Sequence, residues 1–233
     1  AVGTWFRNQK KKNLHGRRLM VTAGPTREAI DPVRYISNFS SGKMGYAIAA
    51  ELKERGAEVI LVTGKTALTP PDGVQTVDVV TAEQMFRAAT KAFDRCDAAV
   101  MCAAVADYTP QAVADTKIKK EGSAWNIALQ PTRDIAAAIG AVKGTRLVAG
   151  FALETDHERA NAQSKLERKN MDFIVLNSLQ DDGAGFGGNT NKITILRRDG
   201  SETVFGLKSK TEVAADIVDE IEAFWAPKNA RPE

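Results

Sequence analysis

Short apolar runs alternate with helical segments along most of the 233-residue chain, and this alternation constrains the fold more than any other feature. RRLMVTA (17–23) and EVILVT (58–63) are apolar runs of the kind that is buried in a parallel sheet. Between them, GYAIAAELKERG carries apolar residues at helical spacing and stops at Gly56. The same pattern predicts strands at 74–80, 97–103, 145–152 and 172–177, and helices at 82–94, about 132–140 and 157–170. It indicates an α/β protein with a doubly wound, mostly parallel, Rossmann-like sheet.

The C-terminal part departs from this alternation. KITILRR and SETVFGL flank Asp199-Gly200, a strong signal for a two-residue turn, so we expect an antiparallel hairpin there and a final helix at about 209–225. Polar stretches at 24–41, 105–123 and 177–191 are predicted as loops, and the last two are long enough to be functional.

Two helix starts are predicted from single residues. Thr81 and Gln84 have the spacing of a capping box for the helix at 82–94. Pro131 or Thr132 is the expected start of the helix near 132–140.

Basic residues are concentrated at the N-terminus. Six of the 32 basic residues and no acid lie in residues 1–18, and without this segment the chain carries 26 basic and 29 acidic residues, a net charge of −3. We interpret residues 1–16 as a basic linker or N-terminal extension, 17–226 as the functional domain and 227–233 as a tail; a polyanion-binding arm is the alternative for the basic run. We therefore expect no nucleic-acid partner.

Neither a membrane segment nor a metal-binding cysteine motif is predicted. The apolar run AAVMCAAVA (98–106) is too short to span a bilayer. Cys96 and Cys102 lack the spacing of a metal site or redox pair. We expect a soluble, cytoplasmic protein that has no membrane partner.

The segment NFSSGKMG (38–45) opens a predicted helix without matching a standard nucleotide motif. It is not a Walker A loop, and it lacks the position of a GxGxxG fingerprint, which joins the first strand directly to the first helix. Gly64-Lys65-Thr66 ends like a Walker A loop, but its first glycine position falls inside a strand. The segment instead offers backbone amides and the hydroxyls of Ser40 and Ser41 to an anion at a helix N-terminus; a serine-capped turn is the alternative.

Charged residues follow several of the predicted strands. Asp107 follows the fourth strand, where it would hold ribose hydroxyls or a metal, or cap a turn. Asp134 would cap a helix or bind a metal-bound water. Lys165 and Lys169 share one helical face and would contact phosphate or solvent. The KIKK run (117–120) would form a cationic lid over a nucleotide or a solvated surface.

Several of these segments together resemble one enzyme family. VTAGPTREAIDPVRYISNFSSGKMGYAIA, AAVADY, KIKK, GFALET and KLERKNMDFIVLN, in this order, are similar to the phosphopantothenoylcysteine synthetase domain of bacterial coenzyme A biosynthesis, over about residues 17–225. In many bacteria this domain is the C-terminal half of a bifunctional chain whose other half is a flavin-dependent decarboxylase. The resemblance implies that 4'-phosphopantothenate attacks CTP to give an acyl-cytidylate and pyrophosphate, and that cysteine then displaces CMP. It also implies Mg²⁺ as cofactor and a homodimer with a shared active site.

The resemblance assigns roles to individual residues. For the CTP site it implies Met101, Cys102, Ala103, Asp107, Lys117, Arg133, Asp134, Ile135, Ala136, Phe151, Lys165 and Lys169. Asn38, Arg34 and Lys117 are the implied catalytic residues: Asn38 would hold the acyl group, Arg34 would assist the cysteine step across the dimer, and Lys117 would reach the nucleotide from the lid. Ser40, Ser41 and Gly42 would clamp phosphate and the acyl intermediate, and Asp134 would bind the metal.

One position departs from the family pattern, and two other functions remain open. Many relatives have Asn-Pro-Asp where this chain has Thr132-Arg133-Asp134, so Arg133 is also available to contact phosphate directly. An NADP-dependent Rossmann-type reductase and a non-catalytic nucleotide-sensing module are the alternatives to the ligase.

Overall fold

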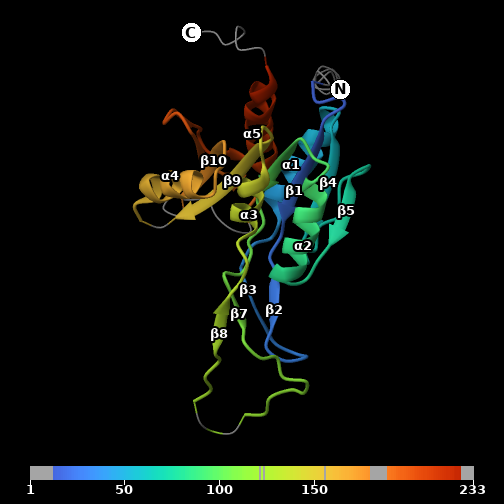
Figure 1. Cartoon of the computed structure of the whole chain (residues 1–233), viewed down its shortest axis with the longest axis vertical. Helices are drawn as coiled ribbons and strands as arrows, with labels where there is room; N and C mark the ends of the chain where they lie inside the picture. Colours follow the sequence, from blue (N-terminus) through green and yellow to red (C-terminus); the bar gives the residue numbers. More distant parts are fainter. Residues whose placement is uncertain (1–12, 121, 123, 155, 179–187, 227–233) are drawn as a thin grey trace.

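A computed structural model describes residues 13–120, 122, 124–154, 156–178 and 188–226. Its centre is an eight-stranded sheet (Figure 1). The strand order is β13 (Glu202–Val204), β12 (Ile193–Arg197), β10 (Phe173–Ser178), β9 (Leu147–Glu154), β6 (Ala98–Met101), β1 (Arg18–Ala23), β4 (Glu58–Thr63) and β5 (Gln75–Asp78). Neighbours from β10 to β5 are parallel, whereas β12 and β13 are antiparallel. The predicted α/β fold with its C-terminal antiparallel hairpin is confirmed.

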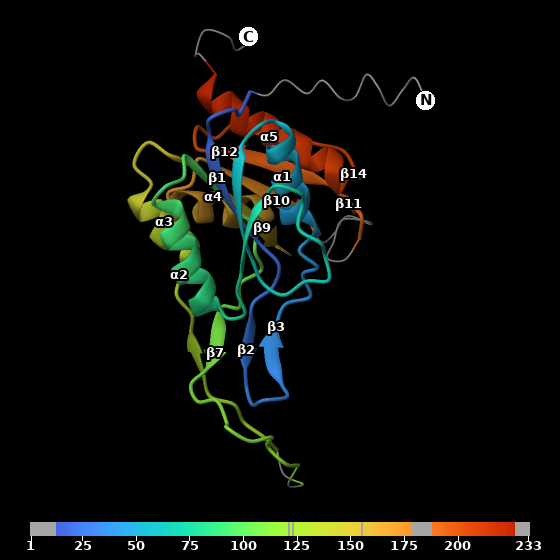
Figure 2. The same cartoon turned by 90° about the vertical axis from the view of Figure 1, so that its right-hand side faces the viewer.

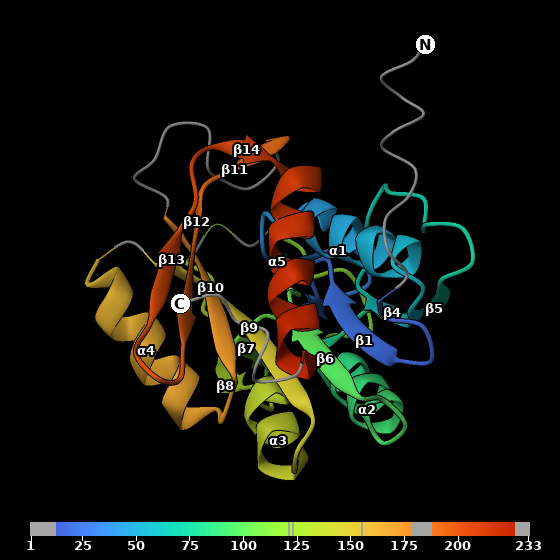
Figure 3. The same cartoon turned by 90° about the horizontal axis from the view of Figure 1, so that it is seen from above.

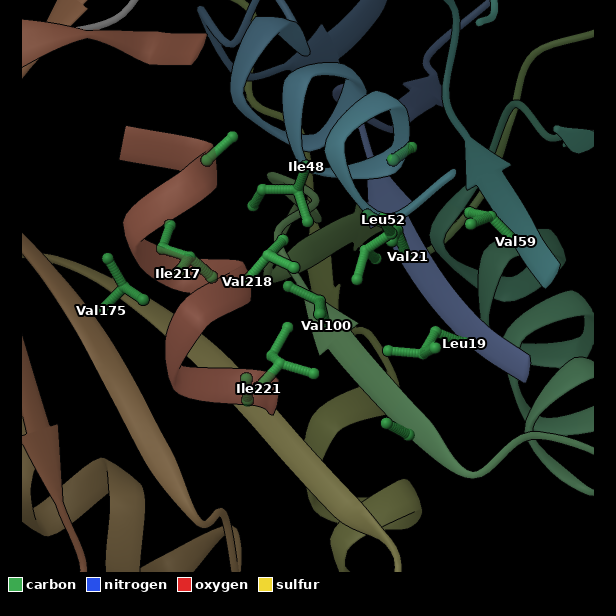
Figure 4. Close-up of a cluster of buried hydrophobic side chains, with 14 of the residues drawn as sticks. Leu19, Val21, Ile48, Leu52, Val59, Val100, Val175, Ile217, Val218 and Ile221 are labelled. Atoms are coloured by element: carbon green, nitrogen blue, oxygen red, sulfur yellow. The ribbon is translucent and has the colours of Figure 1, made fainter. Parts of the chain in front are cut away.

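Helices cover both faces of the sheet (Figure 3). One face carries α1 (Lys43–Glu54) and α5 (Lys210–Trp225), and the other carries α2 (Ala82–Phe93), α3 (Ile135–Val142) and α4 (Glu158–Arg168). Side chains of β1 alternate between the two cores: Leu19 and Val21 pack with α1 and α5, whereas Met20 packs with the other helices. Figure 4 shows the first core, with Ile48, Leu52, Ile217, Val218 and Ile221 from the helices gathered over Val21, Val100 and Val175 from the sheet.

The local signals for helix ends are partly confirmed. Thr81 and Gln84 form the expected capping box at the start of α2, and Gly56 follows α1 with a φ of +93°. The prediction for α3 is wrong by three to four residues, because this helix begins at Ile135 with Asp134 as its N-cap. Pro131 cannot start it, since it pairs with Tyr108 in a short strand.

The C-terminal turn also differs from its prediction. Arg197 donates its backbone N–H to the Ser201 carbonyl over 2.9 Å, which leaves three residues, 198–200, in the loop instead of two. Gly200 has a φ of +83° and donates to the Arg197 carbonyl over 3.1 Å. This is the three-residue hairpin loop in which glycine takes the left-handed position.

Two short hairpins project from the carboxyl edge of the sheet (Figures 1 and 2). β2 (Arg27–Ala29) pairs with β3 (Tyr35–Ser37), and β7 (Tyr108–Pro110) pairs with β8 (Leu129–Pro131). We call residues 25–37 and 107–131 the arm. Both 24–41 and 105–123 were predicted as loops; that prediction is wrong where these three-residue strands form.

A third small sheet lies beside the start of α5. It pairs β11 (Thr190–Asn191) with β14 (Lys208–Ser209). The loop predicted at 177–191 therefore begins within β10 and ends in β11, and its residues 179–187 lie outside the described residues, as do 1–12 and 227–233. Leu14, inside the segment interpreted as an extension, is 1% exposed and belongs to the first core. No helix in the described part of the chain is long and apolar enough to cross a membrane.

Candidate functional site

Two neighbouring cavities lie at the carboxyl edge of the sheet, where parallel α/β sheets place their ligands. The first has a volume of about 260 Å³ and lies between the ends of β6 and β9, the start of α3 and the face of α4. The second has a volume of about 320 Å³ and lies between the first turn of α1, the β6–β7 connection, β11 and the first residue of α5. Both cavities are lined by Ala103, Val105, Asp107, Phe151 and Lys165.

Most of the predicted site residues line one of these two cavities. In the first are Met101, Ala103, Asp107, Arg133, Asp134, Ile135, Ala136, Phe151, Lys165 and Lys169. In the second are Asn38, Ser40, Ser41, Gly42, Cys102, Ala103, Asp107, Phe151 and Lys165. Residues that are up to 131 positions apart in the sequence are thus brought together at one sheet edge.

Cations and two carboxylates line the first cavity, and Asp134 is the carboxylate that pairs with a cation. Lys169 Nζ lies 3.0 Å from Asp134 Oδ2, and Asp134 Oδ1 accepts the Ala137 N–H over 3.0 Å as the helix cap. Burial opposes the ionisation of Asp134, but these two partners outweigh it and lower the pKa of the carboxyl group. Lys165 donates to the Phe151 carbonyl over 2.9 Å, which holds its ammonium group on the shared wall. The cavity wall therefore carries three basic side chains, Arg133, Lys165 and Lys169, beside the carboxyl groups of Asp107 and Asp134.

The backbone after β6 is fixed by a threonine that the sequence reasoning missed. Thr22 Oγ1 accepts the N–H groups of Cys102 and Ala103 over 3.1 and 3.2 Å. Asp107 is held in place by its own carbonyl, which accepts the Thr132 N–H over 2.9 Å. Burial raises the pKa of the Cys102 thiol to about 12, so this group is neutral at physiological pH. A threonine within a buried strand carries no sequence signal for such a role.

The first turn of α1 forms one wall of the second cavity. Its N-cap is Gly42, which has a φ of +79° and makes no side-chain hydrogen bond to the helix. Ser40 Oγ accepts the Gly42 N–H over 3.3 Å, so a serine caps the turn before the helix, as the alternative expected, and not the helix itself. Gly45 brings this turn against β1, because a Cβ there would lie 2.6 Å from the Cβ of Ala23. Asn38 lies beside it and donates to the Ala104 carbonyl over 3.0 Å.

Four polar residues of the second cavity were not identified from the sequence as site residues. They are Lys43, Asn177, Asn191 and Lys210. Lys43 donates to Asn189 Oδ1 over 2.8 Å, and Lys210 donates to the Gly188 carbonyl over 2.7 Å. Burial lowers the pKa of the Lys210 ammonium, and the charge of Lys43 lowers it further. Lys43 could have been identified from the sequence, because it lies within the NFSSGKMG segment. The other three residues lie in segments without a motif.

Arg34 and Lys117 lie in the arm and line neither cavity among the described residues. Arg34 pairs with Asp31 and donates to the Ile118 carbonyl over 2.8 Å, and its guanidinium lies 4.6 Å from the ring centroid of Trp125. Asp31 in turn accepts the Ile118 N–H over 3.2 Å. This pair fastens the β2–β3 turn to the segment that carries the exposed Lys117.

Arg133 lines the first cavity, but its charge is directed toward α2. Its guanidinium lies 3.5 Å from the centroid of the Phe86 ring and 3.6 Å from a carboxylate oxygen of Glu83. The departure from the family pattern at this position therefore adds a contact between the α3 start and α2.

Comparisons with known proteins agree with this fold. The family model for the DNA/pantothenate metabolism flavoprotein C-terminal domain matches residues 14–224. A cysteine/cysteine sulfinic acid decarboxylase from an unknown prokaryotic organism is 52% identical over 94% of this chain and 62% of its own length. The coenzyme A biosynthesis bifunctional protein CoaBC of Bacillus subtilis (strain 168) is 41% identical over 94% of this chain and 54% of its own length.

A solved structure matches the chain nearly end to end. The crystal structure of the C-terminal domain of a coenzyme A biosynthesis bifunctional protein CoaBC is 42% identical, and the match covers 91% of this chain and 97% of that one, with a TM-score of 0.79. The chain thus corresponds to a domain that is about half of the longer curated relatives.

Proposed function

This chain belongs to the family of DNA/pantothenate metabolism flavoprotein C-terminal domains, and on that premise we propose that it joins 4'-phosphopantothenate to cysteine in coenzyme A biosynthesis, using CTP. The alternative is an NADP-dependent reductase. In a dinucleotide-binding fold the first strand leads directly into the first helix. Here the β2–β3 hairpin stands between β1 and α1, which favours the ligase.

The observation that carries the proposal is the shared wall of the two cavities. Asp107 and Lys165 face both, so a nucleotide whose ribose hydroxyls bind Asp107 lies with its phosphates beside Lys165. Asn38 lines the second cavity, where it would hold the acyl group of the activated acid. A carboxylate is a poor electrophile, so it gains a leaving group from CTP before the amine of cysteine attacks it. Cationic side chains around a triphosphate suit that first step.

Magnesium fits the site as an ion that the nucleotide carries. The described residues contain no group of three or more His, Cys, Asp or Glu side chains that would form a protein cage. Mg²⁺ usually binds one or two carboxylates together with substrate phosphates, and Asp134 and Asp107 line the same cavity. Asp134 would hold the ion, which would supply neutralising charge to the phosphates.

We also propose a homodimer built through the arm. Its described residues expose six large apolar side chains, each 41–58% exposed: Val33, Tyr35, Tyr108, Val113, Trp125 and Leu129. Association through these residues would bring Arg34 and Lys117 of one protomer toward the site of its partner. Native fusion to a flavin-dependent decarboxylase is a further proposal, since the chain covers 54% of the bifunctional relative.

The activity is tested by following each product separately. The ligase predicts pyrophosphate release from CTP only when phosphopantothenate is present, and CMP release with amide formation only after cysteine is added. Absorbance change at the reduced-nicotinamide wavelength would favour the reductase. Tight CTP binding without turnover would favour a nucleotide-sensing module, and CO₂ release from cysteine alone would favour the activity named for the 52% identical relative.

A further inference from the structure

Two lysines enter the second cavity from the first residues of two different helices. Lys43 is the first residue of α1 and Lys210 is the first residue of α5. Lys210 is only 9% exposed, and both ammonium groups donate to neutral oxygens next to β11. Two like charges and two helix N-termini at one cavity favour an anion that carries more than one negative charge.

Two carboxamides that line this cavity each have a side-chain oxygen without a hydrogen-bond partner in the described part of the chain. Asn177 and Asn191 line the cavity, Asn191 is 3% exposed, and Oδ1 of each is buried with no hydrogen-bond partner in the described part of the chain. Buried carboxamides are normally satisfied, so an unsatisfied one indicates a ligand or water that completes the site. Each carboxamide also carries two N–H donors that can be turned toward an anion.

The position of the second cavity relative to the first identifies this anion. Asp107 and Lys165 line both cavities, so a nucleotide that bound Asp107 through its ribose would pass Lys165 and extend its phosphate chain into the second cavity. Resting on the ligase proposed above, we propose that Lys43 and Lys210 bind the β- and γ-phosphates of the nucleotide and hold them as the pyrophosphate leaving group.

This role has a defined place in the activating step. A carboxylate oxygen of the acid forms a bond to the α-phosphorus, and the bond from that phosphorus to the bridging oxygen breaks. The electron pair stays on the bridging oxygen, which departs as part of pyrophosphate, and no proton is transferred. Charge therefore builds up on the leaving group, where two ammonium groups stabilise it. The cysteine step releases CMP and does not use this contact.

The experiment compares ligands with and without the terminal phosphates. Calorimetric titrations of CTP, CMP, pyrophosphate and phosphopantothenate are made with the wild type, Lys210→Met, Lys43→Met and Lys210→Arg. The control is Lys208→Met, because Lys208 lies two residues away and pairs with Asp216 over 2.8 Å outside the cavity. We expect Lys210→Met and Lys43→Met each to weaken CTP and pyrophosphate binding by about 10- to 100-fold, while CMP binding changes little. Lys210→Arg should restore part of the loss, and the control should match the wild type.

The outcomes separate this inference from the proposed function. Equal weakening of CTP and CMP would overturn it, and so would unchanged CTP binding in both methionine variants. Selective weakening of phosphopantothenate would place the phosphate of the acid in the second cavity instead. If the wild type binds pyrophosphate through Lys210 but forms no amide, the proposed ligase activity would be refuted and the proposed anion site would be retained. If Lys210→Met does not fold, as shown by circular dichroism, Lys43→Met decides.

Discussion

Gly45 controls how closely the first turn of α1 approaches β1, and its replacement by alanine should disturb both stability and the second cavity. The added Cβ would lie 2.6 Å from the Cβ of Ala23, 3.2 Å from its Cα and 3.3 Å from the Thr22 carbonyl oxygen. Ordinary van der Waals contact begins near 3.4 Å, so the helix start must move by about 0.8 Å. Because Ala23 belongs to a central strand and is fully buried, the helix is the element that moves.

Two opposing effects set the magnitude of this change. Overpacking a buried contact costs about 1–3 kcal/mol. Alanine gains up to about 1 kcal/mol over glycine within a helix. We therefore expect the free energy of unfolding to fall by about 1–2 kcal/mol, which lowers the melting temperature by roughly 2–8 °C for a domain of this size. The displaced N-terminal turn should also weaken CTP binding by about tenfold, the equivalent of one charge-assisted hydrogen bond.

Urea unfolding followed by circular dichroism measures the first effect, and calorimetry with CTP measures the second. Gly206→Ala is the control, because a Cβ at Gly206 meets no atom within 4 Å and its backbone φ is not positive. The sign of the change in the free energy of unfolding decides the outcome, because an alanine in an unstrained helix would stabilise the protein. A Gly45→Ala variant at least as stable as the wild type would refute the close approach of α1 to β1.

Three further changes test other parts of the structure. Asn38→Asp should slow amide formation more than it weakens nucleotide binding, because it would place a like charge beside the acyl phosphate of the proposed intermediate; unchanged amide formation would count against the proposed role of Asn38. Arg55→Met should lower the free energy of unfolding by about 3–5 kcal/mol in urea, because it leaves the 3% exposed Glu51 side chain without its cation; a loss below about 1 kcal/mol would contradict this. The Arg34 guanidinium lowers the pKa of Asp31, so the stability from that carboxylate is full above about pH 4 and is lost as the pH falls below it. Urea titrations across this range should show a shallower loss for Asp31→Asn, and equal slopes would contradict the pairing.

The sheet and its helices were predictable because each is coded by a local pattern. The β-branched run of β4 and the capping box at Thr81 identify their elements without tertiary information. The start of α3 was placed too early because Pro131 is a good helix-start residue, while its pairing with Tyr108 is a long-range contact. The arm was missed for a related reason: its three-residue strands are too short to show a period.

The residues of the first cavity were easier to predict from the sequence than those of the second cavity. Asp107 follows a recognisable strand, and Lys165 and Lys169 share a helix face, so their side of the edge was visible in the sequence. Lys210 shows no such signal, since it becomes part of the cavity only through the packing of α5 against α1 and the β11–β14 pair. Arg34 and Lys117 show the opposite case, because the resemblance assigns them to the site but the structure does not place them at it. Arg34 contacts the residue next to Lys117 in the arm, and neither side chain lines one of the two cavities.

The start of β1 and the end of α5 lie at the edge of the sheet opposite the arm and the two cavities (Figures 1 and 2). A reporter, an immobilisation tag or a neighbouring domain joined beyond either of these points would therefore lie across the sheet from the two cavities. Surface-coupled assays on this domain can be anchored from that side without covering the cavities.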